Sequence, residues 1–290
     1  MVRIYYCAGT TANMTDPTFP TTILPDQIVA LERIERDAIA DLYAAASPDV
    51  AHRFGLQHRR IDDGIWSVSR VLDHIMFCRL QGLGVENAAR AEAVDDAITS
   101  FETANVKNWI IQLAPGADVL ARLLAARRFE RHPRAWAKFV FAGEPSVLRS
   151  GLTIREIDVR HAPAFGAVAS AAFGLPPTAA PWLGSIVGRP NFRTFMAFAG
   201  ETAVAGGTVF IKDGVAWLGL AGTLASHRGQ GAQSEILAAR ILAARDAGAK
   251  LISTETGIPH EGEIGPSFKN IQRAGFRVAY ERPNFRRPDP

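Results

Sequence analysis

Cysteine is scarce in this 290-residue sequence, in which only Cys7 and Cys78 occur. A single pair cannot make the disulfide framework of a small secreted domain, and the paired cysteines of a zinc site are missing. Reduced thiols in a cytoplasm are the default state for such a composition. We therefore expect a cytoplasmic protein without a bound metal.

Long apolar runs and an excess of one charge are missing as well. No run approaches the roughly 18 residues of a membrane-spanning helix, and the N-terminus lacks the charged-then-apolar pattern of a signal peptide. The 32 Lys and Arg side chains nearly balance 29 Asp and Glu, which leaves a net charge of +3. Nucleic-acid binders gather basic residues on one face. We interpret the short, proline-interrupted tail Arg282, Arg286 and Arg287 as solvated, and we expect neither a nucleic-acid nor a membrane partner.

The composition supports a large packed core, because 48% of the residues are hydrophobic and 21% are charged. A chain of 290 residues exceeds the usual size of one domain. The break at Gly143-Glu144-Pro145 favours a boundary there. We predict an extended lead-in at 1–24, an N-terminal α/β domain at 25–143, a linker at 144–151 and a second domain at 152–290.

Hydrophobic periodicity predicts alternating helices and strands in both halves. In the first half we expect a helix that begins at Gln27 after a capping Asp26, strands at 66–72, 75–80, 109–113 and 135–141, and helices at 91–104 and 119–127. In the second half we expect strands at 152–157, 194–199, 202–212, 215–224, 251–255 and 276–282, and helices at 162–172, 233–247 and 267–274. This order favours an α/β sandwich with a mixed sheet.

The two halves end alike. Residues 123–129 followed by 135–141 parallel residues 271–276 followed by 279–285 in pattern. Two α/β units of similar length also match by chance, so a diverged duplication and two unrelated units both remain open.

The segment most informative about chemistry runs from Arg228 through Gly229, Gln230 and Gly231 to Ala232. It follows an apolar strand and opens directly into a long helix. Backbone N–H groups at such a helix start converge on one point, where the helix dipole favours an anion. Glycine lets the backbone approach phosphate closely, and Arg228 can add a charge-assisted contact. The loop is a candidate phosphate site; a tight strand-to-helix turn is the plainer alternative.

Two common phosphate motifs do not fit, because the loop lies too late for the dinucleotide fingerprint and lacks the Gly-Lys-Ser/Thr of a Walker loop. The residues resemble instead motif A of the GNAT acyltransferases, Arg/Gln-x-x-Gly-x-Gly/Ala, which Arg228 to Gln233 follow except at the last position. Residues 267–276, which end in Gly275-Phe276, are similar to the closing helix of that family. The resemblance covers about residues 152–285.

The resemblance implies a mixed, mostly antiparallel central sheet flanked by helices, in two copies if the first half is a degenerate relative. It also implies that acetyl-CoA is the cosubstrate and that a primary amine attacks the thioester directly, without a metal. In that family the strand before the loop pairs with the pantetheine arm, which corresponds here to Leu220–Leu224 around Gly222. The backbone near Leu224 would polarise the thioester carbonyl.

Two positions depart from the family pattern. Gln233 stands where Gly or Ala is usual, and we expect it to crowd or contact the pyrophosphate. Ile271 stands where many members carry the tyrosine that protonates the CoA thiolate, so we consider Tyr280 a substitute acid, against a half-buried strand aromatic. Glu255 is the favoured base because burial at the end of an apolar strand raises a carboxyl pKa. A solvent-facing strand-end carboxylate is the alternative.

Other polar residues are weaker candidates. His227 adjoins the glycine loop, and His260, Glu261 and Glu263 can line an acceptor site; a packing histidine and a solvated loop are the alternatives. The stretch 173–183 is interpreted as a substrate-facing loop or as core packing.

The first half contains no equivalent of Arg228 in register. Its nearest loop has Gly82 and Gly84, followed by Glu86, whose charge would repel phosphate. We expect no cofactor there, and a role as a roof over the acceptor site or as a subunit contact. The function predicted from the sequence is N-acetyl transfer to a small-molecule or peptide amine. A non-catalytic acyl-CoA-binding or sensor protein is the alternative, and a homodimer stays open.

Overall fold

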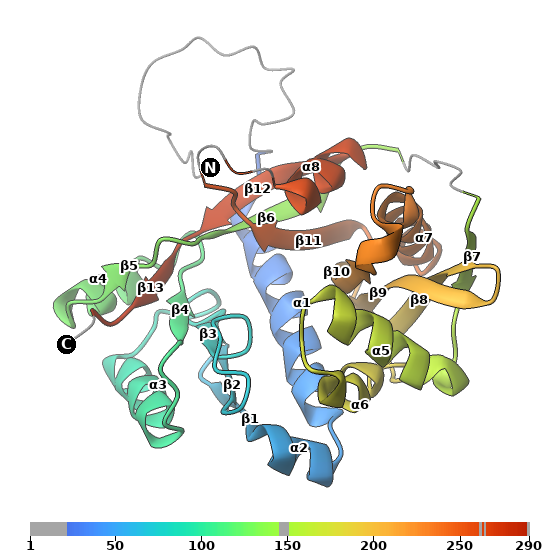
Figure 1. Ribbon diagram of the computed structural model, residues 1–290. Coiled ribbons are helices and arrows are strands. Elements are labelled where there is room, and N and C mark those ends of the chain that lie inside the picture. Colours follow the sequence, from blue (N-terminus) through green and yellow to red (C-terminus); the bar gives the residue numbers. More distant parts are fainter. Residues whose placement is uncertain (1–21, 145–150, 261–262, 264, 289–290) are drawn as a thin grey trace.

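The computed structural model describes residues 22–144, 151–260, 263 and 265–288 (Figure 1). The lead-in expected at 1–24 and the linker expected at 144–151 lie outside this part of the chain, apart from residues 22–24, 144 and 151. Cys7 and Glu261 lie outside it as well. No helix in the described ranges is long and apolar enough to cross a membrane.

The first half opens with a long helix, α1 (Pro25–Ala44). Its first position is Pro25, where a missing N–H costs nothing, and Asp26 lies in the first turn rather than at the N-cap. The sequence patterns did not predict the next two elements, a short helix and a strand; the polar residues 57–60 of that strand are exposed or half-buried and show little alternation. The elements that follow are α2 (Pro48–Phe54), β1 (Leu56–Ile61), β2 (Gly64–Ser69), β3 (Arg79–Gln81), α3 (Ala91–Thr103), β4 (Ile110–Gln112), α4 (Asp118–Ala126), β5 (Glu130–Arg131) and β6 (Trp136–Phe141).

The second half contains every helix and strand that its periodicity predicted, within a few residues of the expected bounds. Besides three single turns of 3-10 helix, a short α-helix that begins within 173–183 and a last short strand occur in addition among its described residues. The elements are β7 (Thr153–Glu156), α5 (Ala162–Ala172), α6 (Ala180–Gly184), β8 (Phe192–Ala199), β9 (Thr202–Lys212), β10 (Val215–Thr223), α7 (Ala232–Asp246), β11 (Leu251–Gly257), α8 (Pro266–Arg273), β12 (Phe276–Arg282) and β13 (Asn284–Arg286).

The two sheets repeat one topology. Their strand orders are β1-β2-β3-β4-β13-β5 and β7-β8-β9-β10-β11-β6-β12. In each sheet, an antiparallel run, β1-β2-β3 or β8-β9-β10, ends in a parallel pair joined by a crossover helix, as β3–α3–β4 and as β10–α7–β11; the second sheet has β7 as an additional edge strand. This element-by-element match confirms the expected mixed, mostly antiparallel sheet flanked by helices, in two copies.

Each half lends one strand to the sheet of the other. Strand β6 lies between β11 and β12, and strand β13 lies between β4 and β5, all in antiparallel pairing. Of the two segments whose patterns are alike, 135–141 contains the crossing strand β6, whereas 279–285 contains the end of β12, which stays in the second sheet, and the start of the crossing strand β13. Residues of the first half thus lie inside the second sheet, next to β11.

Helix α1 lies between the two sheets and packs on both (Figure 1). It contacts β1 and β2 of the first sheet and β9, β10 and β11 of the second. Helices α5 and α6 share its face of the second sheet, whereas α7 and α8 cover the opposite face. The site described below therefore lies where the second sheet meets an element of the first half.

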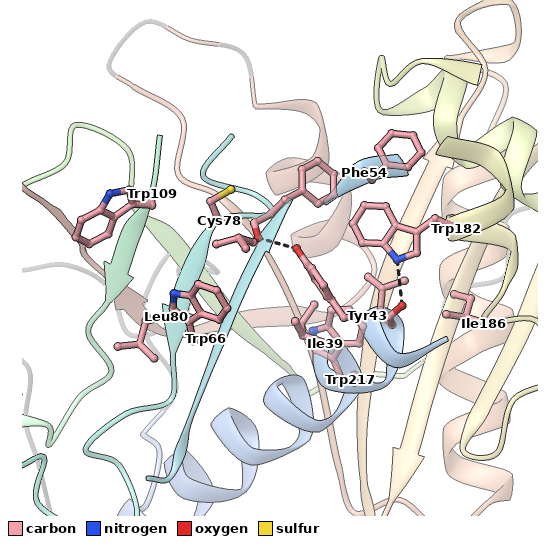
Figure 2. Packing of buried hydrophobic residues seen from close by; sticks show 14 of the residues in the cluster. Ile39, Tyr43, Phe54, Trp66, Cys78, Leu80, Trp109, Trp182, Ile186 and Trp217 are labelled. Carbon is pink, nitrogen blue, oxygen red and sulfur yellow. Dashed lines mark hydrogen bonds between the residues drawn. The ribbon is translucent and has the colours of Figure 1, made fainter. Parts of the chain in front are cut away.

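Trp182 of α6 is fully buried at the junction of the two halves (Figure 2). Its indole N–H donates to the carbonyl oxygen of Leu42 on α1 at 3.1 Å. Its ring lies 5.2 Å from that of Tyr43 and 5.4 Å from that of Phe77, centroid to centroid. Of the two interpretations of residues 173–183, core packing is the one that Trp182 fits.

Candidate functional site

Strands β10 and β11 begin as a parallel pair and then part. Their pairing ends at Leu218 opposite Thr254. Beyond that point β10 continues along β9 to Thr223, whereas β11 continues along β6 to Gly257. Strand edges that separate in this way leave backbone groups for an extended ligand to pair with.

An irregularity in β10 accompanies this divergence. The pairing with β9 shifts between Gly219 and Gly222, and Leu220 has a φ of 47°. Arg240 of α7, which is buried, donates to the carbonyl oxygens of Thr208 at 3.1 Å and Gly219 at 3.3 Å. Burial lowers the pKa of Arg240 to about 9. The guanidinium therefore holds the two strands in the bulged arrangement.

Gly222, at the predicted pantetheine position, lies at the end of the bulge and close to α5. A Cβ atom built there would lie 2.4 Å from the Cβ atom of Ala172. A larger residue therefore does not fit unless α5 moves. The predicted role of this position in cofactor binding stays a prediction.

The loop after β10 ends at an uncapped helix N-terminus. Gly229 and Gly231 have φ values of 78° and 84°, a region that costs other residues about 1–2 kcal/mol. Gly231 is the N-cap of α7 and has no side chain that accepts from the first-turn N–H groups. Orphan donors and the helix dipole together favour an anion at this point.

The two departures from the motif have different surroundings. The side-chain oxygen of Gln233 accepts from the Nδ2 of Asn270 on α8 at 2.8 Å. This bond ties the Gln233 side chain to α8. Ile271 is buried in the core beneath α8, together with Phe139 and Phe276. Arg228 is exposed at the loop entrance.

Glu255, the proposed base, lies just beyond the point where β10 and β11 part. Its Oε2 accepts from the Nζ of Lys138 at 2.9 Å and from the Nε1 of Trp217 at 3.0 Å. The side chain is 11% exposed. Burial raises the pKa of Glu255, and the charge of Glu35 raises it further, while Lys138 and Arg282 act against them. A carboxyl group with a raised pKa is suited to take a proton near neutral pH.

Arg282 corrects one expectation, since its side chain is fully buried rather than solvated. It donates to Glu35 at 2.6 and 3.1 Å and to Glu32 at 3.2 Å. Lys138, also fully buried, donates to Glu35 as well as to Glu255. The end of β12 thus contributes a cation to a buried ionic cluster beneath α1.

Tyr280, the proposed acid, belongs to the same cluster. It is 2% exposed, and its hydroxyl donates to Oε1 of Glu32 at 2.7 Å. Burial raises the pKa of Tyr280 well above its usual value, and the carboxylate of Glu32 adds to the rise. The acid role stays a prediction, and the hydroxyl proton is already engaged.

The weaker candidates have few contacts with the site. The Nδ1 of His227 lies 2.9 Å from the hydroxyl of Ser226 beside the loop. The backbone N–H of His260 donates to Glu263, and both residues are exposed. Within the described ranges no group of three or more His, Cys, Asp or Glu side chains could hold a metal ion.

The corresponding loop of the first half, between β3 and α3, holds an anion that belongs to the chain itself. The carboxylate of Asp63 accepts from the backbone N–H groups of Gly84 at 2.9 Å, Val85 at 2.9 Å, Glu86 at 2.6 Å and Asn87 at 3.2 Å. Converging backbone N–H groups of this kind form an anion-binding concavity. In this half the position is filled by Asp63, a residue that no sequence motif pointed to.

Glu86, which was expected to repel phosphate, is paired instead with cations of α1. It binds the guanidinium groups of Arg33 and Arg36, each at 2.6 Å. The hydrogen bond from Arg33 is the main cause that lowers the pKa of Glu86 to about 2. The carboxylate is therefore charged at neutral pH, next to the loop that Asp63 fills.

No protein-family model matches the sequence, and no curated protein does. Solved structures do match. A GCN5-related N-acetyltransferase from Kribbella flavida is 17% identical, with a TM-score of 0.56, over 87% of this chain and 96% of its own. A GCN5-related N-acetyltransferase from Sphaerobacter thermophilus is 14% identical, with a TM-score of 0.55, over 96% of this chain and 98% of its own.

A tandem GNAT protein from the clavulanic acid biosynthesis pathway is 15% identical, with a TM-score of 0.50, over 92% of this chain and 96% of its own. At these identities the likeness concerns the fold. It extends over both sheets, because the matches cover nearly the whole chain. The chain has the fold of the GNAT acetyltransferases, in a tandem arrangement.

Proposed function

We propose that the protein is an acyl-CoA-dependent N-acetyltransferase that transfers the acetyl group of acetyl-CoA to a primary amine. One observation carries the proposal. Strand β10 parts from β11 beyond Leu218, and Glu255 borders the gap between them. The same strand leads to the uncapped N-terminus of α7, where Gly229 and Gly231 lie in the left-handed region. An anion site and a buried carboxylate associated with one strand gap suit an extended phosphate-bearing thioester and its acceptor.

The loop fits the pyrophosphate of acetyl-CoA on three grounds. A Cβ atom added at Gly229 would meet no described residue within 4 Å beyond its chain neighbours, so the backbone is open on that side. Gly231 leaves the first-turn N–H groups of α7 without a side-chain cap. Arg228 is exposed and can add a charge-assisted bond to phosphate. Gly222 and the parted edge of β10 would face the pantetheine arm.

In the proposed reaction, acetyl-CoA supplies the thioester. Glu255 takes a proton from the nitrogen of the neutral amine as it attacks, directly or through one water, while the new C–N bond forms and the C–S bond breaks. The backbone of β10 near Leu224 orients and polarises the carbonyl. The thiolate is protonated last. Tyr280 would have to break its hydrogen bond to Glu32 to donate its hydroxyl proton in that step.

A non-catalytic acyl-CoA-binding protein is the second candidate. It is favoured by the burial of Ile271 at the usual acid position and by the engagement of the Tyr280 hydroxyl. Under this alternative the loop binds CoA equally well and no product forms. Small-molecule amines and peptide amines are both proposed acceptors for the enzyme.

Calorimetric titration of acetyl-CoA tests the cofactor step, with ATP as a competing ligand of similar charge. We expect saturable binding at one site per chain, weakened about tenfold or more by Arg228→Ala, since a charge-assisted bond to phosphate contributes about 1.5–3 kcal/mol. Arg53→Ala, at an exposed arginine on α2, is the matched control and keeps wild-type affinity. Absence of any CoA binding by the folded protein would refute the proposal.

A panel of amines, followed by release of free CoA thiol, then separates the two candidates. Glu255→Gln keeps the size of the side chain and removes the base. We expect this variant to bind acetyl-CoA like the wild type and to lose about 10²–10⁴-fold in kcat, the usual contribution of a general base. Binding without turnover on every amine would favour the non-catalytic alternative.

A further inference from the structure

The ionic cluster beneath α1 joins the two halves of the chain at the proposed base. It contains three carboxylates and three cations, and each of these side chains is at most 11% exposed. Four members come from the first half and two from the second. They are Glu32 and Glu35 of α1, Arg79 of β3, Lys138 of β6, Glu255 of β11 and Arg282 of β12.

Lys138 stands at the centre of the contacts that reach Glu255. Its Nζ donates to Oε2 of Glu255 at 2.9 Å and also to Oε2 of Glu35. Lys138 reaches this place only because β6 crosses into the second sheet, where it pairs opposite Glu255 itself. Arg282 also links the two carboxylates, at 2.6 Å from Glu35 and 3.7 Å from Glu255.

The cluster opens toward the strand gap at one member. The side chains of Lys138, Glu35 and Arg282 are 0% exposed, whereas that of Glu255 is 11% exposed. A buried ion pair adds little to stability compared with apolar residues of the same shape, because desolvation offsets the attraction. Stability alone therefore gives little reason for the cluster. Because Glu255 is its least buried member, the cluster is suited to control the protonation of that carboxyl group.

We propose that Lys138 and Glu35, both from the first half, are positioning residues that set the protonation state of Glu255. This inference rests on the proposed function, since it gives Glu255 the role of base. It assigns to the first half a part in the reaction other than binding a cofactor. The first half provides the charges, and the second half provides the carboxyl group that they tune.

The two residues act in opposite directions. Burial raises the pKa of Glu255 and the negative charge of Glu35 raises it further, whereas the positive charge of Lys138 lowers it, as does Arg282. The remaining members of the cluster are Glu32 and Arg79, and the hydroxyl of Tyr280 and the indole N–H of Trp217 also face it. Removal of one charge of each sign should therefore move the titration of Glu255 both ways.

Glu35→Gln and Lys138→Met form the test pair, and Trp217 provides the readout. Its indole N–H donates to Glu255 at 3.0 Å, so its fluorescence should change when Glu255 gains a proton. We expect a downward shift of the midpoint in Glu35→Gln and an upward shift in Lys138→Met, each of about one pH unit or more. Trp217→Phe identifies the signal among the five tryptophans.

Two further variants separate tuning from damage. Lys138→Arg keeps the positive charge and should return the midpoint toward that of the wild type. Glu32→Gln removes a carboxylate that binds Arg282 and Tyr280, and it should shift the midpoint less than Glu35→Gln. General loosening of the fold would move both members of the test pair in one direction.

The pH dependence of kcat for acetyl transfer provides the second readout. We expect its acidic limb to move with the fluorescence midpoint in each variant. Suppose that Glu35→Gln and Lys138→Met are active and that both the acidic limb of kcat and the fluorescence midpoint stay at the wild-type pH. That result overturns this inference and leaves the proposed function intact. Shifted midpoints in a protein that binds acetyl-CoA but acetylates no amine overturn the enzymatic part of the proposed function instead. If Lys138→Met does not fold, Glu35→Gln and Lys138→Arg still decide the result.

Discussion

The loop between β3 and α3 should become an anion-binding site when its own anion is removed. In Asp63→Ala, four backbone N–H groups lose their carboxylate acceptor. The bonds from Gly84 and Val85 are partly buried, and those from Glu86 and Asn87 are exposed. Water replaces the exposed pair at little cost.

The cost of the substitution follows from the two partly buried bonds. A hydrogen bond to a charged group contributes about 1.5 kcal/mol at the lower end of its range, so the variant should lose about 3 kcal/mol of unfolding free energy. Urea unfolding of wild type and variant in dilute chloride measures this loss. Asp63→Asn should lose nearly as much, because an amide has one acceptor oxygen and no charge.

Sulfate should restore part of the loss by binding where the carboxylate was. A site with this geometry binds sulfate or phosphate without further help from side chains. At ten times the dissociation constant, bound sulfate stabilises the variant by about 1.4 kcal/mol. Sulfate also stabilises proteins in general by exclusion from their surface, so the quantity of interest is the gain of the variant over that of the wild type.

Asp73→Ala is the matched control. The Asp73 carboxylate accepts from the backbone N–H groups of Lys107 at 2.9 Å and Asn108 at 2.8 Å, at a turn that does not open a helix. This variant should lose stability and gain no more from sulfate than the wild type. Equal gains in all three proteins would refute the idea that the first-half loop is an anion site filled by Asp63.

Three further predictions concern the second half and the ionic cluster. Gly229 and Gly116 are open positions with φ of 78° and 84°, so alanine at either should cost about 1 kcal/mol of unfolding free energy in thermal unfolding. Only Gly229→Ala should also weaken acetyl-CoA binding, by about tenfold in calorimetry. Tyr280→Phe should cost about 1–3 kcal/mol, because it leaves the buried Glu32 short of a donor, while kcat stays within a factor of about three; a far larger loss of kcat would make Tyr280 the acid. Burial favours the neutral form of Glu35, but Arg282, Lys138 and Arg79 outweigh it and hold the pKa of Glu35 well below its ordinary 4.5. The charged Glu35 therefore contributes its full stability above pH 4.5, and this contribution is lost as the pH falls further. Unfolding free energies measured from pH 5 downward should therefore fall less steeply in Glu35→Gln than in the wild type, and equal slopes would contradict this.

Sequence patterns predicted well the elements that depend on residues close together in the chain. The strand, glycine loop and helix from Val215 to Asp246 lie almost where periodicity put them, because each depends on local propensity and on backbone freedom at Gly229 and Gly231. The other strands of the second half followed from the same signals. Short, charged β1 was missed because only Ile61 among its residues is fully buried.

Contacts between distant segments could not be read in this way. Arg282 looks like part of a basic tail, yet it is fully buried against Glu35, 247 positions away in the chain. Nothing in the sequence near Lys138 shows that β6 crosses into the other sheet. Trp182, in a proline-rich stretch, has the composition of a binding loop, but a carbonyl of α1 holds it in the core.

The two crossover loops show how one topology can be used in two ways. Each follows a strand, turns through glycines in the left-handed region and opens a helix beside a parallel partner strand. In the first half the Asp63 carboxylate accepts from the converging N–H groups of the loop. In the second half the N-cap is Gly231, so the first-turn N–H groups of α7 have no side-chain cap. A tethered carboxylate competes with an external phosphate at very high effective concentration, so the first loop is closed to a free ligand. The same tandem arrangement also brings β6 to β11, where Lys138 meets Glu255. A first half whose loop is closed to a free ligand can therefore still be required for the chemistry of the second half, because it provides Lys138.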